Sequence, residues 1–172
     1  MTYLARPLLI IAALALGACT DAGRFGKGDP TAGSGAVTGS GVIEGSASDP
    51  KSPLYFQQAI GDRVLFEVDQ HALNPGAKQV LDGQASWLTT NSDYAAVIEG
   101  HADEQGTREY NLSLGARRAN AVREYLMSRG LPGSRLQTVS YGKERPIEVC
   151  SDESCYSQNR RAVTVLRSGL SG

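Results

Sequence analysis

The fold is decided by residues 94–130, which read YAAVIEGHADEQGTREYNLSLGARRANAVREYLMSRG. The first six residues, Tyr94 to Glu99, contain aromatic and β-branched side chains and predict a strand. A loop bounded by glycines follows from Gly100 to Gly106. From Thr107 to Arg129, apolar residues recur at helical spacing up to Gly130, which predicts a long helix that ends there.

Outward from this unit, the remaining elements follow from the same signals. Asn74 followed by Pro75 predicts a helix start, and the apolar stripe of that helix runs to Leu88 and includes Trp87, which we expect in the core. Three further strands are predicted, over Val64 to Val68, Leu136 to Ser140 and Asn159 to Leu166. The order β-α-β-α-β-(short α)-β predicts an α+β fold, an α/β sandwich with helices on one face of a small mixed sheet.

Composition excludes several functions. The chain has a formal charge of −1, with 17 Lys and Arg against 18 Asp and Glu, and carries no basic stripe. We therefore expect no nucleic-acid partner. The chain has two histidines and three cysteines, and one cysteine, Cys19, lies near the N-terminus. A closed zinc site needs four ligands of these types, so we expect no metal site, and we expect no cofactor. His101 lies near Asp103, but no nucleophile is placed by a motif, so we expect no enzyme.

The N-terminus predicts export and lipidation. Arg6 precedes an apolar run from Leu8 to Leu16, which is too short to span a bilayer and is typical of a signal peptide. Small residues then lead into Cys19, and this end resembles the lipobox of bacterial lipoproteins. The resemblance implies cleavage before Cys19 and its acylation, palmitate included, which anchors a chain stably. A plain secretory signal with an incidental cysteine is the alternative.

The next segment predicts a tether. Residues 20–53 contain eight glycines and almost no large apolar side chains, so they cannot bury enough surface to fold. The root-mean-square span of such a chain is roughly 30–35 Å, and its full extension is about 110 Å. The predicted organisation is a signal peptide (1–18), a lipidated Cys19 with a flexible tether (19–53) and a folded domain (54–172).

Arg118 and Asp103 are the two charged residues that we expect to form a salt bridge or a binding site. Arg118 falls in the middle of the apolar stripe of the long helix, where a guanidinium is costly unless it is paired. Asp103 lies in the loop before that helix and is the candidate partner. The pair is either a structural salt bridge or a site for a zwitterionic ligand, to which the amide groups at the helix start would add. We expect Arg160 and Arg161, before the last strand, to form structural pairs, and ligand binding is the alternative.

Four segments carry a resemblance to a known family: GHADE (100–104), YNLSLGARRANAV (110–122), SYGKERP (140–146) and SQNRRAV (157–163). With the lipobox and the tether, the chain resembles the peptidoglycan-associated lipoproteins of the OmpA-like domain family over roughly residues 64–166. The resemblance implies an outer-membrane lipoprotein facing the periplasm. It further implies peptidoglycan, TolB and the other Tol–Pal components, and outer-membrane lipid as partners, with a role in cell division.

The family's site residues are carried over by position. The resemblance implies that Asp103 binds the ammonium of meso-diaminopimelate and that Arg118 binds a carboxylate. Val68 and Asp69 match pocket residues after the first strand, while Thr107 and Leu114 match the rim and the wall.

This chain departs from the pattern at Glu67, Val68 and Gln105, and in having Cys150 and Cys155. We predict a disulfide between these two cysteines, because they are an even pair in an oxidising compartment. A lipoprotein outside Tol–Pal and a peptidoglycan-processing enzyme are the alternative functions.

Overall fold

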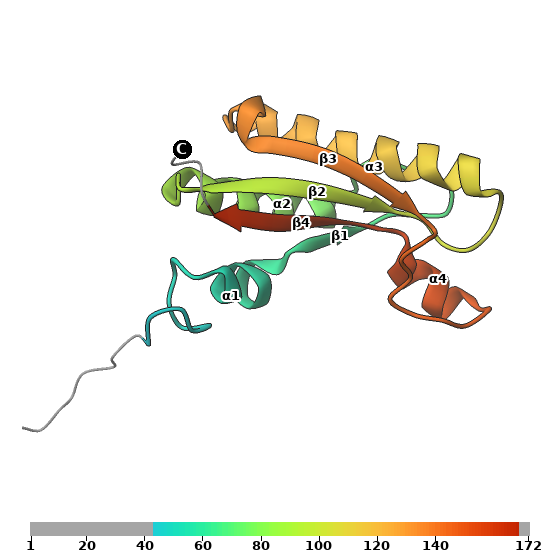
Figure 1. The fold of residues 1–172 in the computed structure, drawn as a ribbon, viewed down its shortest axis with the longest axis horizontal. Coiled ribbons are helices and arrows are strands. Elements are labelled where there is room, and N and C mark those ends of the chain that lie inside the picture. Colours follow the sequence, from blue (N-terminus) through green and yellow to red (C-terminus); the bar gives the residue numbers. More distant parts are fainter. Residues whose placement is uncertain (1–42, 169–172) are drawn as a thin grey trace, which may run out of the picture. The chain divides into compact units, whose positions relative to one another are not determined.

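A four-stranded mixed sheet forms the centre of this computed structural model, which describes residues 43–168 (Figure 1). Its strands are β1 (Arg63–Leu65), β2 (Tyr94–His101), β3 (Leu136–Gly142) and β4 (Arg161–Ser168). They lie in the order β1-β4-β2-β3. β4 pairs antiparallel with β1 and β2, and β2 pairs in parallel with β3. The predicted α+β class with a small mixed sheet is confirmed.

Helices connect the strands in the predicted order. They are α2 (Pro75–Thr90) between β1 and β2, α3 (Arg108–Ser128) and the 3₁₀ turn η2 (Gly133–Arg135) between β2 and β3, and α4 (Glu153–Asn159) before β4. A helical segment that the sequence pattern did not predict precedes β1, formed by α1 (Pro53–Tyr55) and the π-helical η1 (Phe56–Gly61). Among the described residues, no helix is long and apolar enough to cross a bilayer.

Local caps fix the two long helices. The side chain of Asn74 accepts a hydrogen bond from the amide of Ala77 at 2.7 Å at the start of α2. The hydroxyl of Thr107 does the same for the amide of Tyr110 at 3.2 Å at the start of α3. These bonds satisfy amides that have no partner inside the helix.

The first strand is shorter than predicted, which corrects the expected range Val64 to Val68. β1 ends at Leu65, although Phe66 still pairs through its amide with the carbonyl of Arg160 at 2.9 Å. The chain then turns, with the amide of Gln70 bonded to the carbonyl of Glu67 at 3.1 Å. Asp69 adopts a left-handed backbone conformation with φ of 57° in this turn. Val68 therefore lies in a loop and not in the sheet.

The hydrophobic core lies between the sheet and the helices α2 and α3, which lie behind the sheet in Figure 1. Its fully buried members include Leu81 of α2, Ile98 of β2 and Leu126 of α3. Trp87 is buried in the same core, as predicted, and its indole N–H donates to the carbonyl of Pro50 at 2.7 Å. Residues ahead of α1 therefore contact the core of the domain.

Two glycines let α3 approach the sheet closely. A Cβ atom on Gly100 of β2 would lie 1.8 Å from the carbonyl oxygen of Gly115 of α3. A Cβ atom on Gly115 would lie 2.8 Å from the carbonyl oxygen of Gly100. No larger side chain fits between these backbones. The contact fixes α3 over the end of β2 and places Arg118, one turn further along α3, beside the loop that follows β2.

The predicted signal peptide and Cys19 lie outside the described residues, so the expected organisation of that end stays a prediction.

Candidate functional site

Arg118 is the most deeply buried charged side chain of the candidate site. It is 0% exposed, and its guanidinium lies 5.2 Å from the centre of the Phe66 ring. It donates from Nε to the carbonyl of Gln70 at 2.8 Å, from Nη1 to the carbonyl of His101 at 2.8 Å and from Nη2 to the carbonyl of Glu67 at 3.2 Å. Arg118 therefore joins the turn after β1 to the end of β2.

Within the described part of the chain, the charge of Arg118 is not neutralised by a carboxylate. No acidic side chain of residues 43–168 lies within ion-pair distance of it. Burial lowers the pKa of Arg118 to about 10, an effect that the more distant charge of Asp103 partly opposes. A guanidinium carries five N–H groups, and the three carbonyl bonds use one on each nitrogen, so each terminal nitrogen keeps one N–H. These two N–H groups remain as donors for a further acceptor.

Asp103 is buried in the loop between β2 and α3. Its Oδ1 accepts from the amide of Gln105 at 3.3 Å, and its Oδ2 lies 3.3 Å from Nη1 of Arg160. A salt bridge between Asp103 and Arg118, the structural alternative raised by the sequence, is wrong, because the partner of Asp103 is Arg160. The loop itself is held by Lys143, which donates to the carbonyls of Glu104 and Gly106 at 3.2 and 2.7 Å.

The other predicted site residues surround this pair at different depths. Asp69 is exposed and its carboxylate accepts a hydrogen bond from the hydroxyl of Tyr110. Val68 is 54% exposed on the same turn, whereas Leu114 is buried in α3. The hydroxyl of Thr107 is occupied in capping α3. The negative charge of Asp69 raises the pKa of Arg118 slightly, with a smaller effect than burial or the charge of Asp103.

Arg160 and Glu153 complete the charged cluster. Arg160 contacts Asp103 and also pairs with both carboxylate oxygens of Glu153, at 3.2 Å between Nη1 and Oε2. The structural pairing expected for Arg160 is present. Glu153 was not singled out from the sequence. Its only signal in the sequence is its position seven residues before Arg160, the residue that follows α4.

His101 is a buried neutral side chain. Burial, followed by the charges of Arg161 and Arg145, lowers the pKa of His101 to about 4. Neither ring nitrogen has a hydrogen-bond partner within the described part of the chain, and the ring stacks near Tyr141 at 5.6 Å between centres. The carboxylate that lies near the imidazole is that of Glu99, with its Oε2 3.6 Å from Nε2 of His101.

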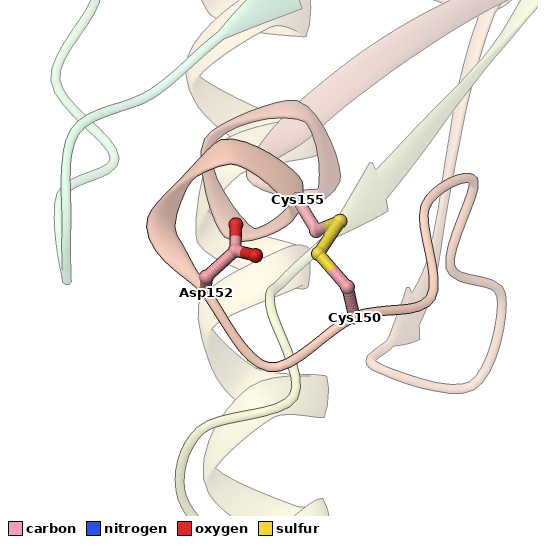
Figure 2. A group of neighbouring side chains, drawn as sticks. All are labelled: Cys150, Asp152 and Cys155. Atoms are coloured by element: carbon pink, nitrogen blue, oxygen red, sulfur yellow. A yellow bond between two sulfur atoms is a disulfide. The ribbon is translucent and has the colours of Figure 1, made fainter. Parts of the chain in front are cut away.

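Cys150 and Cys155 are joined by a disulfide, with their Cα atoms 5.8 Å apart (Figure 2). Asp152 lies between them and caps α4 by accepting from the amide of Ser154 at 2.9 Å. These three residues lie close enough together to suggest a metal site. The two sulfur atoms are bonded to each other, however, and are not the thiolates that a metal would need.

Comparisons with known proteins identify the family and the fold of this chain. The sequence profile of the OmpA family matches residues 65–160. A peptidoglycan-associated lipoprotein of Rhizobium meliloti (strain 1021) is 49% identical over 92% of this chain and 85% of its own length. One of Mesorhizobium japonicum is 55% identical over 73% of this chain and 75% of its own length. The crystal structure of the peptidoglycan-associated lipoprotein from Burkholderia pseudomallei superposes with a TM-score of 0.63 at 36% identity, covering 70% of this chain and 98% of that one.

Proposed function

The chain belongs to the OmpA family and, within it, to the peptidoglycan-associated lipoproteins, and from this premise we propose that it binds the meso-diaminopimelate of peptidoglycan non-covalently. The family membership places it with binding proteins and not with enzymes. Diaminopimelate offers an ammonium and a carboxylate on one carbon atom. A site for it needs one anion and one cation that face a common space.

The observation that carries the proposal is the charge of Arg118. A guanidinium that is 0% exposed and has no carboxylate partner in the described residues is costly to bury. A carboxylate from the ligand would supply the missing counter-charge through the two free N–H groups. Arg118 is 0% exposed in this structure, so a ligand carboxylate reaches these groups only after the residues around the guanidinium shift.

Asp103 takes the ammonium in this proposal. Its carboxylate lies in the loop next to Arg118 and receives one bond from Arg160, which leaves lone pairs for a donor from the ligand. Val68 and Asp69 form the side of the pocket, with Thr107 at its rim and Leu114 in its wall. Each charge-assisted hydrogen bond contributes about 1.5–3 kcal/mol, so several give a micromolar affinity, on the order of 8 kcal/mol.

In this proposal, the N-terminal part of the chain links the peptidoglycan-binding domain to the outer membrane. Acylated Cys19 anchors the protein in the outer membrane. The part of the tether ahead of Pro50 and Ser52, which contact the domain, lets the folded domain reach the cell wall from the periplasmic side. The protein acts within the Tol–Pal system, where it meets TolB and supports constriction during division. A pull-down with purified TolB tests that part of the proposal separately.

The experiment for peptidoglycan binding uses two kinds of purified sacculi. One kind carries diaminopimelate in the stem peptide, and the other carries lysine, which keeps the side-chain ammonium and lacks the neighbouring carboxylate. We expect the full-length protein to sediment with the first kind and to bind the second kind at least tenfold more weakly. Equal binding to both would contradict the assignment of Arg118. Release of soluble muropeptides would indicate an enzyme instead.

A further inference from the structure

A disulfide ring lies next to the candidate site and is not explained by ligand contact. The bond between Cys150 and Cys155 closes a ring that contains the start of α4 (Figure 2). Cys155 is buried, and Cys150 is half-buried. Helices as short as α4 are marginal without tertiary support. The ring therefore adds a covalent restraint to the start of this short helix.

Glu153 lies inside this ring and holds Arg160. Both carboxylate oxygens of Glu153 bond to the two terminal nitrogens of Arg160, and Nε of Arg160 donates to the carbonyl of Phe66 at 3.1 Å. The bond with Arg160 lowers the pKa of Glu153, so the carboxylate is ionised at neutral pH. A bidentate pair of this kind fixes the plane of the guanidinium.

Arg160 in turn holds Asp103. The Nη1 atom that contacts Glu153 also lies 3.3 Å from Oδ2 of Asp103. Two further bonds join the same region to the loop of Asp103, because Ser151 and Tyr156 donate to the carboxylate of Glu104 at 3.3 and 3.0 Å. The disulfide ring is therefore connected to Asp103 by an unbroken series of polar contacts.

We propose that the disulfide ring, through Glu153 and Arg160, is a positioning element for Asp103, so that opening the ring weakens ligand binding while the domain stays folded. This rests on the proposed function, in which Asp103 receives the ligand ammonium. Opening occurs by thiol–disulfide exchange with a dithiol reductant. The reductant becomes a disulfide, and its two electrons and two protons convert Cys150 and Cys155 to thiols.

The test measures the affinity of the full-length processed protein, in detergent, for free meso-diaminopimelate by calorimetry. Wild-type protein is compared before and after reduction with dithiothreitol, and Glu153→Gln is treated in the same way. We expect reduction of the wild type to weaken binding about tenfold, and Glu153→Gln to weaken it by a similar factor in the oxidised state. Reduction of Glu153→Gln should weaken binding less than reduction of the wild type does, because only the connection through Glu104 then remains.

The control is Glu148→Gln, which removes one negative charge from the same loop. The carboxylate of Glu148 is exposed and forms no hydrogen bond or ion pair within the described residues. The Glu148→Gln protein should bind meso-diaminopimelate like the wild type, both with the disulfide intact and after reduction. Thermal melting followed by circular dichroism accompanies every sample, and Glu153→Gln keeps the disulfide, so the proposal can be judged even where reduction lowers stability.

The outcomes separate the two proposals. If oxidised wild-type protein does not bind meso-diaminopimelate, the proposed function fails. If it binds and neither reduction nor Glu153→Gln weakens binding, the positioning role is overturned. The proposal is also overturned if the fold-losses of affinity from reduction and from Glu153→Gln multiply when the two changes are combined. A ring that acts through Glu153 requires the combined loss to be smaller than that product.

Discussion

At the scale of single residues, Arg118 holds two segments together and, in the function that we propose, also binds the ligand. Its three carbonyl partners come from residues 67 and 70 in one segment and residue 101 in another. These bonds hold the turn after β1 against the end of β2. The two remaining N–H groups are the donors that we assign to the ligand. A change at this position therefore affects both stability and binding.

Arg118→Lys tests whether the planar guanidinium is needed in addition to its positive charge. Lysine keeps the positive charge, but its compact ammonium cannot reach three carbonyls in a planar arrangement. We expect the free energy of unfolding to fall by about 1–3 kcal/mol and sacculus binding to be lost. Urea denaturation and co-sedimentation with sacculi measure the two effects. A lysine variant with wild-type stability and wild-type binding would contradict the role given to the guanidinium.

His101 predicts a pH dependence of stability. Its pKa in the folded protein is about 4 because of burial, against 6.5 for an accessible histidine. The unfolded chain thus binds a proton at this residue between these values and the folded one does not. Stability should be full above pH 6.5 and fall progressively towards pH 4, by about 3 kcal/mol.

His101→Phe is the variant that tests this. Phenylalanine fills a similar space beside Tyr141 and does not titrate, so its unfolding free energy should change less between pH 6.5 and pH 4 than that of the wild type. Denaturation curves across this range provide the comparison. Identical slopes for the two proteins would show that His101 is not the titrating group.

At the scale of elements, local signals account for what could be predicted. The range of α3 was expected within one residue at each end, because Thr107 caps its start and Gly130 follows its end. The start of α2 was equally clear from Asn74 and Pro75. The end of β1 was not predictable in this way. It depends on the carbonyl bonds of Arg118 to a distant turn.

The salt-bridge partner of Asp103 could not be predicted from local sequence either. Helical periodicity and the loop between the elements predict that Asp103 and Arg118 face one pocket, and this stays a prediction. Arg160 lies 57 positions from Asp103 in the sequence, and only the pairing of β4 with β1 and β2 brings it near. No local pattern carries that information.

The contact between α3 and β2 makes a prediction for Gly115→Ala. The added methyl group would lie 2.4 Å from the hydroxyl of Ser140 and 2.8 Å from the carbonyl of Gly100. The serine side chain can rotate, but the backbone cannot yield without moving the helix. We expect a loss of about 1–3 kcal/mol in unfolding free energy. Glu124→Ala, at an exposed position of the same helix, should be nearly neutral, and equal stability of both variants would contradict the close approach.

At the scale of the whole molecule, the account predicts an attachment with two ends. The folded domain supplies one end through Asp103 and Arg118. Lipidated Cys19 supplies the other, and the tether between them sets the reach. Binding at many sites of one polymer adds avidity to a modest affinity for each site.

Cys19→Ser tests the membrane end. Without the thiol there is no diacylglycerol and no cleavage at this position, so the protein should appear unprocessed or in the soluble fraction. Membrane fractionation and mass spectrometry of the purified protein measure both. An unchanged mass together with unchanged membrane association would contradict lipidation at Cys19.

The most direct test of the central claim is sacculus binding by the full-length Asp103→Asn protein. Asparagine keeps the shape and the contact with Arg160 while it removes the charge that attracts the ligand ammonium. Asp93→Asn, at an exposed position between α2 and β2, is the matched control. We predict that Asp103→Asn remains folded by circular dichroism and loses at least tenfold in binding to diaminopimelate-containing sacculi, while Asp93→Asn binds normally. A folded Asp103→Asn protein that binds like the wild type would contradict the account.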